Sequence, residues 1–293
     1  MNVVQRFHWL KSDFLSVSIK SAGAEITSVT NTAGLEFIWQ ADKTIWARHA
    51  PVLFPIVGKL KENTFIYNDH NYQIGQHGFA RDLMFELIEG NDSSCVFEIV
   101  SNEKTKLNYP FDFRFQIRYE LSNNTLHTYY KVINPSDNSI FFSVGAHPGF
   151  NCPLLPDEHF EDYFIEFESQ EYSFTELNSG LRSSAKHKVR INENKLFLSE
   201  TLFNNDALVL ENNQINAVSL CSKKSEHKIT LKCVGWPYFG IWSKKGCQKF
   251  VCLEPWYGIA DHENTNQNFI EKDGIIYLEA KKEFNCSFSL SFD

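Results

Sequence analysis

The feature that most constrains the fold of this chain is an alternation of apolar and polar residues that recurs along its length. The alternation runs through residues 15–20, 25–30, 64–67 and 111–121. A period of two is typical of β-strands that bury one face. Short stretches rich in Asn, Asp, Ser and Gly separate these runs, and such turns join neighbouring strands as antiparallel hairpins. The pattern therefore predicts an all-β fold, a large antiparallel β-sandwich.

Later segments repeat the same character. Further strand-forming runs are expected at 72–74, 125–133, 139–144, 207–210, 217–220, 228–234, 239–242 and 287–292. Only residues 157–164 suggest a short helix. No composition shift and no fixed-period repeat divides the chain, and all-β folds of more than 200 residues form single domains. We expect residues 1–293 to form one β-sandwich domain.

Composition excludes several classes of function. Asp and Glu number 36 against 28 Lys and Arg, a net charge of −8, which argues against a nucleic-acid or anionic-membrane partner. Residues 1–11 lack the apolar region and cleavage site of a signal peptide, and no run reaches the roughly 18 apolar residues of a membrane span. Seven cysteines without a C-x-x-C pair favour reduced thiols and a cytoplasmic location over a disulfide framework or zinc ribbon. The oligomeric state leaves no signal in the sequence.

One histidine stands at the end of a predicted strand. The run 139–144 leads into Gly145, and His147 is followed by Pro148 and Gly149. This Gly and Pro punctuation indicates a tight, irregular backbone, which can fix an imidazole at the mouth of a sheet. Histidine has the side-chain pKa nearest to neutral pH and so suits proton transfer. A structural hydrogen bond is the alternative role for His147.

One carboxylate follows an apolar run. Glu254 comes directly after residues 250–253 and precedes Pro255, Trp256 and Tyr257. Burial of an unpaired carboxylate is costly, so this side chain should have a partner or a chemical role. Partial desolvation would raise its pKa toward that of a useful base. Glu254 and His147 on neighbouring strand ends would make an acid–base pair.

Four more polar residues are candidates for ligand binding: Arg48, His77, Arg81 and Asp206. Each has a plainer alternative, namely a solvated charge for Arg48, a strand-end cap for His77, an ion pair with the next residue for Arg81 and a turn for Asp206. The sequence contains no P-loop, G-x-S-x-G or G-x-G-x-x-G motif, and its histidines lack the spacing of a metal site. We therefore expect neither a metal nor a cofactor.

Five motifs carry a resemblance to a known family. They lie in residues 48–58, 76–81, 145–150, 205–208 and 253–256 and span nearly the whole chain. In this order they resemble the aldose 1-epimerase (galactose mutarotase-like) superfamily, and more narrowly its branch of bacterial mutarotase-related proteins found with lactose operons. The resemblance implies a β-supersandwich with a sugar cleft.

The resemblance also implies an activity and roles for the site residues. The activity is interconversion of the α and β anomers of a hexose by acid–base ring opening. Glu254 would be the general base and His147 the general acid. His77 would hold the ring oxygen or a neighbouring hydroxyl, and Arg48 and Asp206 would bind hydroxyls.

Two departures keep the substrate open. Gly145-Ala146 precedes His147 where galactose mutarotases have Asn, and the 77–81 pattern is shared with the hexose-6-phosphate 1-epimerase branch. A hexose-6-phosphate 1-epimerase and a non-catalytic carbohydrate-binding protein are therefore alternatives. A polysaccharide lyase is a third, but the acidic charge balance gives it little support. We expect a neutral aldose, with Arg48 on its hydroxyls and Arg81 in a structural role.

Overall fold

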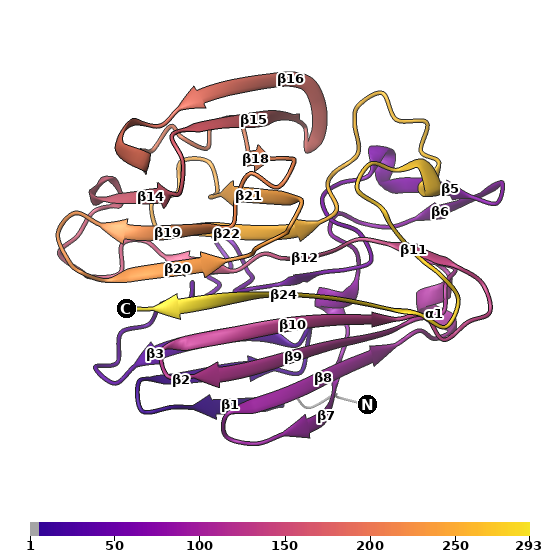
Figure 1. Ribbon diagram of the computed structural model, residues 1–293, viewed down its shortest axis with the longest axis horizontal. Helices are drawn as coiled ribbons and strands as arrows, with labels where there is room; N and C mark the ends of the chain where they lie inside the picture. Colours follow the sequence, from indigo (N-terminus) through magenta and orange to yellow (C-terminus); the bar gives the residue numbers. More distant parts are fainter. Residues whose placement is uncertain (1–5) are drawn as a thin grey trace.

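The computed structural model describes residues 6–293, so the first five residues of the segment tested for a signal peptide lie outside the described part. Two large antiparallel sheets make up most of it (Figure 1). The nine-stranded sheet has, in spatial order, β17 (Lys195–Phe197), β14 (Tyr163–Phe167), β19 (Ala217–Ser222), β20 (Lys228–Lys232), β24 (Glu283–Phe292), β10 (Thr125–Ile133), β9 (Arg114–Ser122), β8 (Ser94–Val100) and β7 (Glu86–Gly90).

The second large sheet carries most of the candidate site residues. Its strands are, in spatial order, β16 (Leu181–Arg190), β15 (Glu171–Asn178), β18 (Leu208–Leu210), β21 (Tyr238–Trp242), β22 (Phe250–Tyr257), β12 (Val144–Ala146) and β4 (Val52–Leu53), and β13 (Gly149–Asn151) also pairs with β22. In Figure 1 these strands lie above β24, β10, β9 and β8.

Smaller elements cover the two sheets. They are β1 (Phe7–Lys11), β2 (Leu15–Lys20) and β3 (Glu25–Asn31), the hairpin of β5 (Thr64–Tyr67) and β6 (His70–Gln73), the pair of β11 (Ile140–Phe142) and β23 (Ile276–Leu278), the helix α1 (Glu103–Lys106), and 3-10 turns at Lys61–Asn63, Ala80–Asp82, Phe160–Asp162, Asn192–Asn194 and Phe269–Glu271. Within residues 6–293, no helix combines the length and the apolar character needed to cross a membrane.

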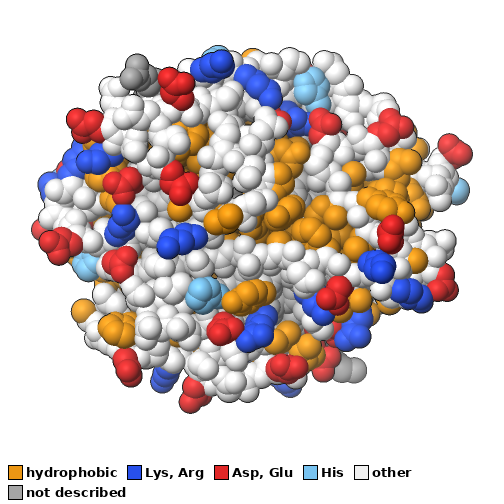
Figure 2. All heavy atoms as spheres, in the orientation of Figure 1, with side chains coloured by type: hydrophobic (Ala, Val, Ile, Leu, Met, Phe, Trp, Pro, Cys, Tyr) orange, Lys and Arg blue, Asp and Glu red, His pale blue; other side chains and the backbone are white. Residues whose placement is uncertain are grey.

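Strand periodicity decides which face each strand buries. In β9 the buried residues Phe115, Ile117 and Tyr119 alternate with the exposed Arg114 and Arg118. Strand β22 differs, because every residue from Phe250 to Trp256 is buried, as expected for a central strand covered on both faces. One continuous cluster of buried apolar side chains includes members of both large sheets. On the face in Figure 2, apolar side chains gather over the region of β11, and charges of both signs are dispersed around them.

The structure bears out the all-β prediction and corrects details of it. The hairpins predicted at 15–30 and 111–133 form as β2–β3 and β9–β10. Strand β6 begins at His70, before the predicted residue 72, because the chain already turns at Asn68 and Asp69 with positive φ angles. The seven cysteines are all free and mostly buried, as expected.

The helix suggested for residues 157–164 was wrong. Only Phe160–Asp162 forms a 3-10 turn, and Tyr163–Phe167 is strand β14, paired between β17 and β19. The aromatic and β-branched residues Tyr163, Phe164 and Ile165 are buried there, so tertiary pairing outweighs the weak local preference for a helix.

Candidate active site

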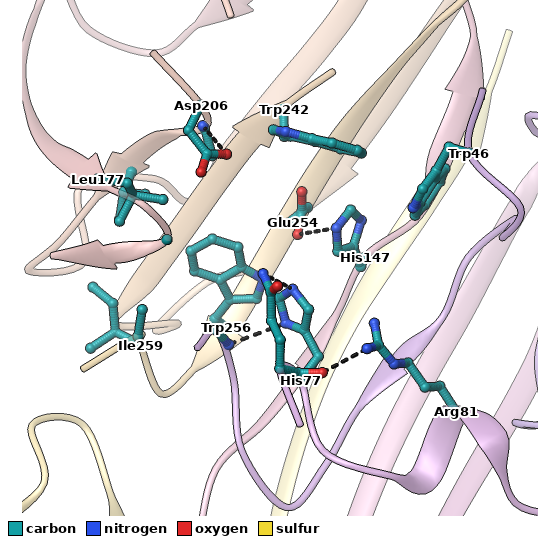
Figure 3. Close-up of a pocket in the computed structure, with 16 residues that line it drawn as sticks. Trp46, His77, Arg81, His147, Leu177, Asp206, Trp242, Glu254, Trp256 and Ile259 are labelled. Atoms are coloured by element: carbon teal, nitrogen blue, oxygen red, sulfur yellow. Dashed lines mark hydrogen bonds and ion pairs between the residues drawn. The ribbon is translucent and has the colours of Figure 1, made fainter. Parts of the chain in front are cut away.

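Strand register brings His147 and Glu254 together. Strands β12 and β13 both pair with β22, with Gly145 opposite Trp256 and Gly149 opposite Cys252. The same register holds on both sides of the interruption at His147-Pro148, so it places His147 opposite Glu254. The Nε2 atom of His147 lies 3.3 Å from Oε2 of Glu254 (Figure 3). Two side chains from distant parts of the chain thus meet on one sheet.

Aromatic rings hold the His147 imidazole. Trp46 stacks on it with ring centroids 5.0 Å apart, and Trp242 meets it edge-on at 5.5 Å. Trp46 in turn stacks on Phe250 at 5.3 Å. Only 7% of His147 is exposed, so its ring is locked by packing and largely shielded from water. These contacts leave the edge of the imidazole that faces Glu254 available for proton transfer.

Burial sets the protonation of the pair. Burial, together with the nearby positive charges of Arg81 and Arg48, lowers the pKa of His147 to about 3. Burial raises the pKa of Glu254 well above its ordinary value, and the charge of Asp206 adds to this rise. Both shifts favour the form of the pair that carries one proton, held on the carboxyl group. A single shared proton is what coupled acid–base chemistry requires.

His77 is held as a neutral hydrogen-bond donor. The backbone N–H of Gly58 donates to its Nδ1 at 3.1 Å, so the hydrogen of the neutral ring is on Nε2. Burial, with the neighbouring His147 and Arg81, keeps the pKa of His77 well below its ordinary value. The ring of His77 meets that of His147 edge-on at 5.5 Å.

The backbone at His77 and Gly78 is unusual. His77 has a φ of 65°, a left-handed conformation that costs a non-glycine residue free energy and concentrates at functional sites. Gly78 also has a positive φ, and a Cβ atom there would lie 2.3 Å from the Phe54 carbonyl oxygen. Glycine is thus required for this loop to pass close to Phe54 and aim His77 into the cavity.

The two candidate arginines have different positions. Arg81 lines the cavity, and its Nη2 donates to the backbone oxygen of Gln76 at 2.6 Å. Arg48 forms an ion pair with Asp82 at 2.9 Å and is not among the residues that line the cavity. The same Asp82 lies 3.9 Å from Nε of Arg81. The structure therefore brings Arg81, rather than Arg48, to the cavity wall.

The far end of the cavity is apolar with one acidic group at its rim. Figure 3 shows Leu177 and Ile259 across the cavity from Arg81, with Asp206 above them. Asp206 is exposed, and its Oδ1 accepts a hydrogen bond from the N–H of Ala207 at 2.9 Å. The cavity volume is about 350 Å³. One polar end, one apolar wall and a rim carboxylate are typical of a site for a small polar molecule with a hydrophobic face.

Four buried polar atoms at the site have no hydrogen-bond partner within residues 6–293. They are Nδ1 of His147, Nε of Arg81, Oε2 of Glu254 and Nε1 of Trp256. Buried polar groups are nearly always hydrogen-bonded in folded proteins, and an unpaired one is costly. Orphaned groups gathered at one cavity therefore indicate a ligand rich in hydrogen-bonding groups.

The cavity thus unites His77, Arg81, His147, Asp206 and Glu254 of the six predicted residues. Sequence reasoning missed Trp46 and Gln76 as lining residues. The Trp46 position follows the Asp42–Thr44 turn, and no local periodicity marks it as part of the site.

Comparisons with known proteins relate the chain to one family. A model of the family described as aldose 1-epimerase matches residues 6–271. The chromosomal protein LacX of Lactococcus lactis subsp. lactis is 34% identical over 262 residues, which cover 86% of this chain and 87% of LacX.

Solved structures show the same relationship. A galactose mutarotase related enzyme from Lactobacillus acidophilus superposes with a TM-score of 0.94 at 36% identity, covering 98% of this chain and 97% of that one. A galactose mutarotase-like protein from Lactobacillus casei gives a TM-score of 0.90 at 30% identity, covering 98% of this chain and all of that one. These similarities cover nearly the whole described chain, including both strands that carry the pair.

Proposed function

The chain belongs to the aldose 1-epimerase family, and from this premise we propose that it is a mutarotase of a neutral hexose, with Glu254 and His147 as its acid–base pair. It is an isomerase of the sugar epimerase class. The observation that carries the proposal is the 3.3 Å contact between two buried, titratable side chains in a cavity with orphaned polar atoms.

The proposed reaction needs one proton on the pair. With a sugar bound, the proton of Glu254 passes to Nε2 of His147 across their contact. The Glu254 carboxylate then takes the proton from the C1 hydroxyl while His147 protonates the ring oxygen, which opens the ring. Rotation about the C1–C2 bond and closure with the roles reversed give the other anomer. Protons are conserved over the cycle, and the pair returns to its starting state.

Neighbouring side chains orient the sugar in this scheme. The Nδ1 of His77 accepts from Gly58, and its Nε2 lies 3.2 Å from the side-chain amide of Gln76. In this scheme Nε2–H exchanges the Gln76 contact for the ring oxygen or an adjacent hydroxyl of the sugar. Asp206 at the rim accepts from hydroxyls on the C2 side, since it lies toward Glu254 and contributes to the pKa shift of that residue. Trp256 and the apolar wall cover the hydrophobic face of the ring, as aromatic side chains do for sugars.

The charge of the cavity favours a neutral sugar. Among its lining residues Arg81 is cationic, whereas Glu254 and Asp206 are carboxylates. A phosphate site normally gathers several positive groups. The second candidate is a hexose-6-phosphate 1-epimerase, and the position of Arg81 in the cavity wall is the observation that favours it. The absence of disulfides among the described cysteines fits our further proposal that the reaction takes place in the cytoplasm.

Polarimetry of freshly dissolved sugars tests the proposal. The protein is added to pure α-D-glucose or α-D-galactose, and the approach to anomeric equilibrium is compared with the uncatalysed rate in the same buffer. We expect a rate proportional to protein concentration with at least one of the two sugars. Binding of these sugars without any acceleration would support the non-catalytic alternative and overturn the proposal.

A further inference from the structure

Cys252 lies beside the acid–base pair, and the reaction does not use it. Cys252 and Glu254 are two residues apart on β22, so their side chains lie on the same face of the sheet. The residue opposite Cys252 on β13 is Gly149, and the ring of Trp46, which stacks on His147, fills the space that a Cβ atom of residue 149 would need. The thiol sulfur, a His147 ring nitrogen and a Glu254 oxygen all lie within 4.8 Å of one another, and all three residues are buried.

This donor set has the composition of a zinc site. Thiolate, imidazole and carboxylate are the three kinds of zinc ligand in proteins, and bond lengths of 2.0–2.3 Å put neighbouring ligands of a tetrahedral ion roughly 3.5 Å apart. The contact of 3.3 Å between His147 and Glu254 already has that spacing. Apart from this ion-pair contact, Oε2 of Glu254 has no hydrogen-bond partner in the described chain, although only 1% of the residue is exposed. The open side of the pair faces the cavity, where water can supply a fourth ligand.

We propose that the active site binds one thiophilic divalent cation of the Zn²⁺ class through His147, Cys252 and Glu254, and that this ion inhibits the enzyme. On binding, the thiol proton and the proton shared by the pair leave to solvent, and three metal–ligand bonds form. The ion occupies both groups that the sugar needs, so inhibition is competitive. A hard ion such as Mg²⁺, which prefers oxygen ligands, binds poorly there.

Cadmium spectroscopy tests the site without reference to catalysis. Cd²⁺ is titrated into the protein, and the ultraviolet charge-transfer band from thiolate to cadmium is recorded. One equivalent should give the band in the wild type and in Cys233→Ser, a buried cysteine of the opposite sheet region that donates to Ile215. The band should be absent in Cys252→Ser. If thermal unfolding shows that this variant folds poorly, Cys252→Ala takes its place and should also lack the band.

Inhibition of mutarotation by Zn²⁺ gives the second readout, expressed relative to each variant's own uninhibited rate. Zn²⁺ should inhibit competitively with the sugar, and EDTA should reverse the inhibition. The Cys252→Ser substitution should weaken inhibition by Zn²⁺ about tenfold or more, because loss of even an outer-shell partner of a metal ligand lowers metal affinity by that factor. The proposal would be overturned if the wild type gave no cadmium band, or if the band were lost in Cys247→Ser rather than in Cys252→Ser. It would also be overturned if Zn²⁺ inhibited the wild type and Cys252→Ser equally, or if Mg²⁺ inhibited the wild type as strongly as Zn²⁺. A Cd²⁺ band without mutarotase activity would retain the metal site and contradict only the proposed function.

Discussion

The imidazole of His147 and the carboxyl group of Glu254 face each other 3.3 Å apart, although more than a third of the chain separates them. Glu254 is part of β22, and His147 lies beside that strand, at the interruption between its partners β12 and β13. A regular strand in place of His147-Pro148 would continue the ladder along β22. The interruption therefore gives the imidazole its access to the carboxyl group and the cavity.

The pH dependence of catalysis should follow the shifted pKa values of this pair. The one-proton form is lost below the pKa of His147, lowered to about 3, and above the raised pKa of Glu254. We therefore expect the acid limb of kcat/KM to lie near pH 3 and its descending limb to lie above the ordinary glutamate value. Unperturbed histidine and glutamate groups would instead confine the one-proton form to between about pH 4.3 and 6.5. The limbs belong to the coupled pair rather than to either residue.

Initial rates between about pH 4 and 10, with folding checked at each pH by circular dichroism, measure this profile. A fall of kcat/KM from about pH 5 to 4, where an ordinary carboxyl group titrates, would contradict the assignment of the shifted pKa values.

The choice between a neutral and a phosphorylated sugar depends on Arg81. We expect glucose or galactose to bind at least as tightly as its 6-phosphate, because Arg81 shares the cavity lining with two carboxylates and is already engaged with Gln76. Titration calorimetry with both forms of each sugar measures the preference. Arg48→Ala is the matched control, since Arg48 pairs with Asp82 outside the cavity lining. A 6-phosphate that binds tenfold tighter, with the gain lost in Arg81→Ala and kept in Arg48→Ala, would assign the protein to the hexose-6-phosphate branch.

Much of the fold was predictable because local patterns encode it. The alternation in Arg114–Ser122 and Thr125–Ile133, with a short polar turn between them, specifies the β9–β10 hairpin without reference to the rest of the chain. The hairpin of β15 and β16 was not predicted, because its polar residues show no clear alternation. The first two residues of strand β14 fell within the expected helix. Their local sequence carries no clear strand signal, because the strand is defined by its pairing with β17 and β19 on either side.

The site was predictable in its residues but not in its geometry. The Gly and Pro punctuation around His147 and the carboxylate after an apolar strand single out the pair. Their contact depends on the pairing of β12 and β13 with β22, a long-range register that no local signal contains. The same holds for Trp46, which reaches His147 only because its loop folds over β13, where its backbone neighbour His49 accepts a hydrogen bond from Gly149.

A buried ionic cluster beside the cavity should be important for stability. The guanidinium of Arg182 donates to the Ala260 oxygen at 2.9 Å and pairs with Glu211 and Asp273, while Lys272 donates to the Ile259 oxygen. Arg182→Met would leave buried acceptors unpaired, so we expect a loss of about 3 kcal/mol or more in the free energy of unfolding. Because Ala260 and Ile259 line the cavity, KM should rise as well.

Urea unfolding of the variant measures this loss. Arg114→Met is the control, since Arg114 pairs with Glu98 at an exposed position and such pairs contribute about 1 kcal/mol or less. Equal stability losses in the two variants would show that the cluster has no special role.

The most direct test of the central claim is the mutarotation rate of Glu254→Gln on the best substrate. Glutamine keeps the shape of the side chain but cannot accept the C1 proton, so kcat should fall about 100-fold or more, while sugar binding by calorimetry stays close to wild type. Glu98→Gln, a carboxylate of the nine-stranded sheet, is the matched control and should retain full activity. A Glu254→Gln variant that turns over the sugar at the wild-type rate would contradict the account.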